Sequence, residues 1–80
     1  MEFSPNAVVS LTTISPVLSQ EQFATFLGTT LDTVRGWVEN NTVPHVKIGR
    51  QRYINVIAFV NDLKNGKTIF TRGDYGHDSD

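Results

Sequence analysis

The feature that most constrains the fold is a very short connection, Gly28-Thr29-Thr30, between two segments with helical periodicity. The first segment follows Ser19, with Gln22 three residues later, which is the spacing of a capping box. It is expected to end near Leu27, because glycine at position 28 adopts the left-handed conformation that closes a helix. The apolar stripe expected to be buried consists of Phe23, Ala24, Phe26 and Leu27.

The second segment is expected to form a helix from Leu31 to about Glu39. Thr29 or Thr30 can cap it, and Asp32 lies in the first turn, where the helix dipole favours an acid. Apolar residues recur at core-facing positions, namely Leu31, Val34, Trp37 and Val38. The polar face that remains for solvent consists of Asp32, Thr33, Arg35, Gly36 and Glu39.

A β-hairpin is predicted after the second helix. Asn40-Asn41 and Val43-Pro44 mark a turn, since asparagine tolerates left-handed dihedrals and proline cannot continue a helix. His45–Ile48 and Arg52–Ile54 then flank Gly49-Arg50-Gln51. A three-residue connection that contains glycine is typical of a hairpin, here with two basic residues at or beside its tip. We call this hairpin the wing.

A last helix is expected from Val56 to about Lys64, with Asn55 as its cap and Asn65-Gly66 at its end. Its expected core face consists of Ile57, Val60 and Leu63, with Val56 and Phe59 close by. Lys64 and Lys67 suit the negative end of the helix dipole and need no partner.

The two ends of the chain have a different character from its middle. Residues 1–17 show no helical period and are interpreted as an arm or an edge strand. Residues 65–80 form a tail rich in Gly and Asp, through which Ile69, Phe70 and Tyr75 are scattered. The predicted organisation is therefore an arm of residues 1–17, one folded domain of residues 18–64 and a tail of residues 65–80.

Charge is distributed unevenly along the chain, although the net charge at pH 7 is −1. Residues 1–34 carry three acids and no base, and residues 73–80 carry another three acids. Residues 35–72 hold all seven Lys and Arg residues against two acids, which gives this segment a charge of +5. For a nucleic-acid partner this distribution matters more than the sum.

Several classes of protein are excluded by the sequence. The absence of cysteine removes disulfide scaffolds, thiolate zinc sites and thiol catalysis. The longest apolar run, Val56–Val60, is far shorter than the roughly 20 residues of a membrane span, so a cytoplasmic location is expected. Asp32, Glu39 and Asp62 show no catalytic spacing, and no nucleophile motif accompanies the two histidines. We expect no enzyme, cofactor or metal.

The order of helix, tight turn, helix, hairpin and helix over Leu18 to Leu63 resembles the excisionase and MerR-like winged helix-turn-helix family. The residues that carry the resemblance are Ala24, Gly28, Val34, Trp37, Val43-Pro44, Val46–Arg50 and Arg52–Ile54. It covers about the middle half of the chain and implies a mainly α fold with a small β-hairpin. The small size looks most like the Cox/Apl class of temperate phages, whose members act as recombination directionality factors and as transcriptional repressors.

The resemblance and the side-chain chemistry together point to double-stranded DNA. The second helix can enter a major groove, where Thr33 and Arg35 are expected to contact bases or phosphates. Thr29 and Thr30 offer hydroxyls and free backbone N–H groups to a phosphate, and Gly36 permits close approach of the backbone. The bases of the wing expected to contact phosphates or a minor groove are Lys47, Arg50 and Arg52.

Self-association on DNA is expected, because the second helix offers few residues for base contacts. The acidic ends can face the basic middle of a neighbour, and the apolar contacts expected are Val8, Val9, Leu11, Ile69 and Phe70. Such a row of protomers would bend DNA, and the resemblance adds a site-specific integrase as a partner. Two alternatives are a protein-interaction adaptor, whose DNA affinity would show no salt dependence, and a terminase small-subunit-type packaging module. The aromatic residue of the second helix, Trp37, is assigned to the core rather than to stacking on a base.

Overall fold

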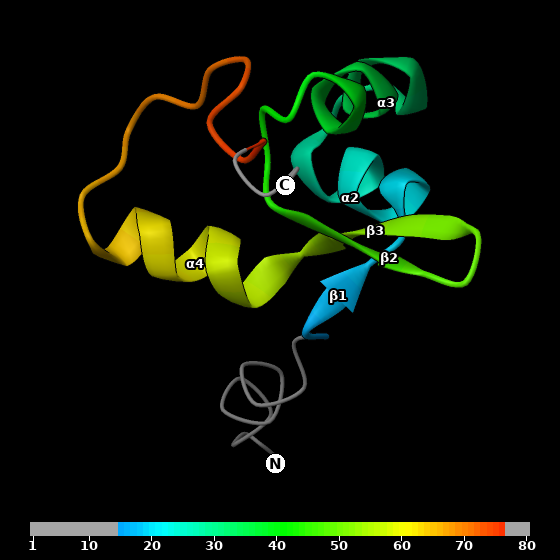
Figure 1. Ribbon diagram of the computed structural model, residues 1–80, viewed down its shortest axis with the longest axis horizontal. Helices are drawn as coiled ribbons and strands as arrows, with labels where there is room; N and C mark the ends of the chain where they lie inside the picture. The colour runs from blue at the N-terminus through cyan, green and yellow to red at the C-terminus, as the bar shows by residue number, and fades with distance from the viewer. Residues whose placement is uncertain (1–14, 77–80) are drawn as a thin grey trace, which may run out of the picture.

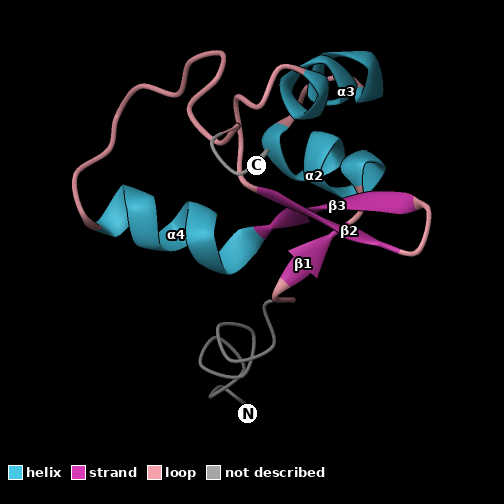
Figure 2. Ribbon diagram, viewed as in Figure 1, coloured by secondary structure: helices cyan, strands magenta, loops and turns pink. Residues whose placement is uncertain are grey.

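The computed structural model describes residues 15–76, which form three helices and a small antiparallel sheet (Figures 1 and 2). The elements in chain order are β1 (Val17–Leu18), α2 (Gln20–Leu27), α3 (Leu31–Glu39), β2 (His45–Ile48), β3 (Gln51–Asn55) and α4 (Val56–Lys64). This arrangement is a winged helix-turn-helix and confirms the expected fold class. No helix within residues 15–76 is long and apolar enough to cross a membrane.

The caps predicted around α2 are present. The Gln22 backbone N–H donates to Ser19 Oγ at 3.0 Å, and the Ser19 N–H donates to Gln22 Oε1 at 3.1 Å, which completes the capping box. Gly28 ends the helix with φ +76°, and the N–H of Thr29 donates to the Ala24 carbonyl at 2.9 Å. The chain therefore leaves α2 in a fixed direction and starts α3 after only three residues.

The core lies where α2 and α3 pack against the sheet. Its buried apolar side chains are Phe23, Ala24, Val34, Val38, Val43, Ile54 and Val56. Trp37 packs against this cluster, which confirms its structural assignment. Phe59 brings α4 to the same cluster through an edge-on contact with Phe23, with ring centroids 5.3 Å apart.

The sheet has three strands rather than the two of a simple hairpin, in the order β1-β3-β2. Val17 and Leu18 pair with Asn55 and Ile54, so the edge-strand alternative applies to this part of the N-terminal segment. The Val56 N–H also donates to the Pro16 carbonyl at 2.9 Å. Residues 1–14, with the apolar contacts expected at Val8, Val9 and Leu11, lie outside the described residues.

The predicted three-residue connection of the wing is wrong. Ile48 pairs with Gln51, so the loop holds only Gly49 and Arg50, and β3 begins one residue earlier than expected. Gly49 has φ +64°, the left-handed conformation that a two-residue hairpin turn with glycine in its first position requires. One consequence is that Lys47 lies directly opposite Arg52.

Part of the expected core is exposed. On α2, Phe26 is 73% exposed and Leu27 is also open to solvent, while Phe23 and Ala24 are buried as expected. On α4 the expected core face is likewise exposed, and its residues are Ile57, Val60 and Leu63. Helical period identifies an apolar face, but no further layer covers these faces within residues 15–76.

The tail folds back onto the domain instead of remaining separate (Figure 1). Phe70 packs against Phe59, with ring centroids 5.2 Å apart, and stacks on Tyr75. Lys67 Nζ lies 2.9 Å from an Asp74 carboxylate oxygen and 4.8 Å from the centre of the Phe70 ring. Both side chains are engaged within the chain, so Lys67 has a partner that the sequence did not predict. The expected contact of Phe70 with a neighbouring protomer stays a prediction.

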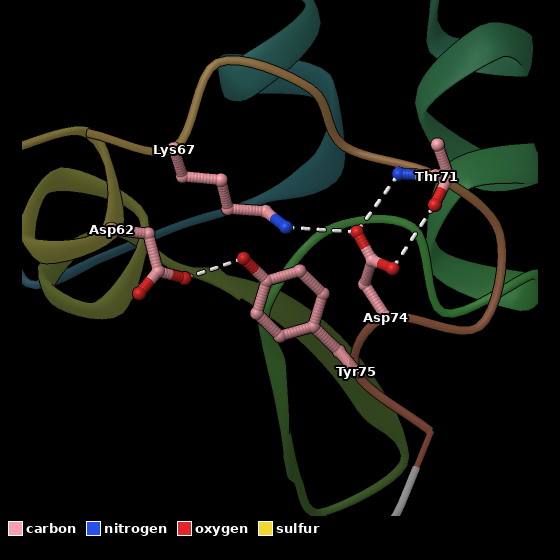
Figure 3. A network of polar contacts seen from close by, with 5 residues as sticks. All are labelled: Asp62, Lys67, Thr71, Asp74 and Tyr75. Atoms are coloured by element: carbon pink, nitrogen blue, oxygen red, sulfur yellow. Dashed lines mark hydrogen bonds and ion pairs between the residues drawn. The ribbon is translucent and has the colours of Figure 1, made fainter. Parts of the chain in front are cut away.

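A polar network holds the tail in place (Figure 3). Asp74 accepts hydrogen bonds from the Thr71 N–H at 2.9 Å and the Thr71 hydroxyl at 3.0 Å, in addition to Lys67. The Thr71 N–H and then the Lys67 ammonium lower the pKa of Asp74 to about 2. The Tyr75 hydroxyl donates to Asp62 on α4, and partial burial together with this bond raises the pKa of Tyr75.

Candidate nucleic-acid interface

A polar groove runs between α3 and the wing. The residues that line it are Gln20, Arg35, Val38, Glu39, Lys47, Arg50, Gln51 and Arg52. A second hollow adjoins it near the start of α2 and shares Gln20, Arg35, Gln51 and Arg52 with the first. The four bases predicted as DNA contacts on the second helix and the wing are thus brought together around one groove, although they come from two elements.

The wing presents two of these bases as a cross-strand pair. Lys47 on β2 and Arg52 on β3 occupy directly opposite positions, and both are exposed. Like charges in this arrangement destabilise a hairpin. An anion lying over the pair would offset that cost, so this part of the groove is electrostatically suited to phosphate.

Arg35 contributes the base from α3. Its Nη1 atom lies 3.6 Å from Asp32 Oδ1, one turn earlier, with the two side chains 59% and 92% exposed. An ion pair this exposed contributes little to stability, so it does not hold the guanidinium in place. Arg35 is therefore available to a ligand in the groove, while Asp32 and Glu39 add negative charge to the same helix.

Gln20 was missed by sequence reasoning. Its Nε2 atom donates to the Arg52 carbonyl at 3.0 Å, which ties the start of α2 to β3 across 32 residues of sequence. No local pattern indicates a contact between residues so far apart. Gln51 was missed for another reason, since it was assigned to the loop although it is the first residue of β3.

The threonines at the start of α3 differ in the hydrogen-bonding groups that they present to a ligand. Thr30 caps the helix, accepting from the Thr33 N–H at 3.2 Å, and the two hydroxyl oxygens lie 2.9 Å apart. Both side chains are exposed and lie outside the groove lining. The expectation of a free backbone N–H at Thr29 is wrong, because that group donates to Ala24 at the end of α2.

Gly36 lies in the middle of α3 and is not required by the fold. A Cβ atom at this position would have no atom of the rest of the described chain within 4 Å, apart from its own helix and sequence neighbours. Its φ is also outside the left-handed region. Glycine in a helix interior costs about 0.5–1 kcal/mol relative to alanine, so its presence here favours a role outside the folded chain.

His45 was weighed as a phosphate contact or metal ligand. Its Nδ1 atom lies 2.9 Å from the Val43 carbonyl, a hydrogen bond within the turn that leads into β2. Within residues 15–76, no group of three or more His, Asp or Glu side chains lies close enough to hold a metal ion. His45 thus has a structural partner in this turn.

Two helices joined by a short turn, with the second beside a basic wing groove, define a DNA-binding module of the helix-turn-helix class. The profile of the helix-turn-helix domain family matches residues 17–61, and the chain belongs to this family. Over 67 residues it is 49% identical to the "10.1 kDa protein" of Pseudomonas phage Pf1, an alignment that covers 80% of this chain and 74% of that protein. No solved structure matches the chain.

These comparisons support a DNA-binding protein of phage origin. Membership in a DNA-binding domain family also agrees with the expectation of a non-enzymatic protein.

Proposed function

We propose that this protein is a phage recombination directionality factor of the excisionase type that also represses transcription. It binds double-stranded DNA in a sequence-specific way through α3 and the wing. The observation that carries the proposal is the convergence of Arg35, Lys47, Arg50 and Arg52 on one groove in a protein whose net charge is −1.

In this proposal α3 enters the major groove and the wing follows the DNA backbone beside it. Thr33 and Arg35 contact bases or the adjacent phosphates, and Gly36 lets the duplex approach the helix backbone closely. Thr29 and Thr30 lie at the start of α3, where hydroxyl groups suit a phosphate oxygen. The bases of the wing, Lys47, Arg50 and Arg52, contact phosphates or the neighbouring minor groove.

Cooperative binding follows from the small footprint of one domain. A single module of this kind buries only about 600–1,000 Å² on DNA, and α3 offers few side chains for base contacts. Neighbouring protomers therefore supply the remaining affinity, and a row of protomers bends the DNA into the shape that an integrase needs. Exposed apolar side chains that can serve such contacts are Phe26, Ile57 and Ile69.

The decisive experiment is a footprint on DNA from the protein's own genetic neighbourhood, combined with an excision assay that contains the neighbouring integrase. We expect repeated protected sites in phase with the DNA helix, and excision that depends on the added protein. Arg50→Ala serves as a matched variant, in which both protection and excision should be weakened. Binding without salt dependence would favour the adaptor, and protection confined to a packaging site would favour the terminase-type module.

A further inference from the structure

We infer that Arg72, in the tail, is a DNA phosphate contact on the side of α3 that lies away from the wing. This inference rests on the proposed DNA-binding mode and extends its contact surface to a segment outside the helix-turn-helix match, which ends at residue 61. The tail then belongs to the DNA-binding surface.

Arg72 is held at the C-terminal end of α3. Its Nη2 atom donates to Asn40 Oδ1 at 3.1 Å, and the N–H of the next residue, Gly73, donates to the Asn40 carbonyl at 2.8 Å. Tyr75 is tied to the following residue in the same way, through a 2.9 Å bond from its N–H to the Asn41 carbonyl. Three hydrogen bonds thus fix this part of the tail beside the C-terminal end of α3.

The tail and the wing lie on different sides of α3. Arg35 and Glu39, four residues apart, line the groove with the wing. Asn40 follows Gly36 by four residues, so these two residues lie on one face of the helix. This face differs from that of Arg35 and Glu39. The tail residue Phe70 lines an apolar hollow with Trp37 and Phe59, and none of these three residues lines the groove beside the wing. Figure 1 shows the returning tail and the β2–β3 loop on separate sides of α3.

This placement matches the dimensions of a DNA duplex. An α-helix with its side chains is about 10–12 Å across and fills a major groove about 12 Å wide, so phosphates of the two strands run along both sides of the helix. The wing supplies bases to one side only. Arg72 supplies to the other side a base that, unlike Lys67 in the same loop, is not paired with a carboxylate.

The charge of Arg72 is available to a ligand. Its partner is the neutral amide of Asn40, whereas Lys67 in the same loop is paired with the Asp74 carboxylate. Arg72 is exposed, and a guanidinium has five N–H donors, of which this hydrogen bond uses one. The bonds from Thr71 to Asp74 fix the adjacent turn, so little ordering is needed when DNA binds.

The test is the salt dependence of binding to a random-sequence duplex and to the footprinted site, measured with the full chain by fluorescence anisotropy. Arg72→Ala is expected to weaken binding to both DNAs and to reduce the log–log salt slope by about 1, while Arg72→Lys retains the slope. Lys64→Ala is the matched control, because this base lies on α4, at the far end of the molecule from the wing loop (Figure 1). It should leave the slope unchanged.

Folding is checked by thermal unfolding of each variant. If Arg72→Ala lowers the melting temperature, Arg72→Gln decides, since it removes the charge and retains a polar amide in a shorter side chain. A wild-type slope for the uncharged variant, alongside a reduced slope for Arg50→Ala, would overturn the inference and leave the proposed function intact. Absence of salt-dependent binding in the wild type would overturn both.

Discussion

Lys47 and Arg52 lie directly opposite each other across the two-residue turn of the wing. A hairpin selected for stability alone would place opposite charges, or a β-branched pair, at these positions. The two bases instead place like charges side by side on a hairpin whose own fold does not need them. This arrangement suits an anionic partner, which would offset the repulsion between the two bases.

Lys47→Thr should therefore raise the stability of the domain and weaken its binding to DNA. Removal of the repulsion with Arg52 is expected to increase the free energy of unfolding by a few tenths of a kcal/mol, within the roughly 0.2–1 kcal/mol typical of cross-strand pairs. Urea unfolding followed by Trp37 fluorescence gives the stability, and anisotropy gives the affinity. A variant that is less stable, or that binds DNA as well as the wild type, would contradict this account.

Arg50→Ala and Arg35→Ala should have different consequences. Arg50 lies at the tip of the wing, so its loss is expected to weaken binding to all sequences and to reduce the log–log salt slope by about 1. Arg35 lies on α3, and its loss should reduce discrimination between specific and random DNA by roughly 1–3 kcal/mol if it contacts a base pair. Equal losses on both DNAs would make Arg35 a phosphate contact only.

The features that could be predicted from the sequence are the local ones. Ser19, Gln22 and Gly28 determine where α2 begins and ends through contacts within a few residues, so both predictions were correct. By contrast, the contacts of Gln20 with Arg52 and of Arg72 with Asn40 each join residues 32 positions apart. No periodicity or turn pattern in the sequence predicts contacts of this kind.

The errors also have physical causes. Ile57 on α4 follows the helical period correctly, yet it is 58% exposed because no element covers that face within residues 15–76. The wing loop was assigned one residue too many because Gly49 allows a tighter turn than the strand pattern indicates. The four bases were named as candidates from the sequence, but only the three-dimensional structure brings Arg35 beside the wing.

Gly36→Ala should separate stability from function. The new methyl group meets no atom of the described chain beyond its own helix and sequence neighbours, so the free energy of unfolding is expected to rise by about 0.5–1 kcal/mol. DNA binding should weaken, because the same methyl group occupies the space between the helix backbone and the duplex. Unfolding and anisotropy measurements on one preparation test both parts. Higher stability with unchanged affinity would show that DNA does not approach the helix at this residue.

The stability contributed by Asp74 should disappear at low pH. Its pKa falls from an ordinary value of 3.8 to about 2 in the folded protein, because the Thr71 N–H and Lys67 favour the carboxylate. A group whose pKa is lowered by folding stabilises the protein above its unfolded pKa and loses this effect as the pH falls towards the folded value. The difference in melting temperature between wild type and Asp74→Asn should therefore be constant above about pH 5 and shrink between pH 4 and pH 2. A difference independent of pH would exclude this ionisation as its cause.

Ile69 and Phe70 provide a matched pair for testing assembly on DNA. These neighbours in the tail have opposite environments, since Ile69 is 70% exposed whereas Phe70 packs between Phe59 and Tyr75. Ile69→Ser should leave the melting temperature and single-site affinity nearly unchanged and reduce cooperativity on DNA with several sites. Phe70→Ser should instead lower the melting temperature, because it removes aromatic contacts that hold the tail on α4.

Point substitutions suit this question better than deletion of residues 68–80, which would also remove the hydrogen bonds that Gly73 and Tyr75 make to the end of α3. Titration of duplexes with one and with three sites measures the cooperativity, and the single-site duplex is the internal control. Cooperativity that is unchanged in Ile69→Ser would exclude this side chain from the contact between protomers. Saturation at one protomer on the three-site duplex would exclude side-by-side assembly itself.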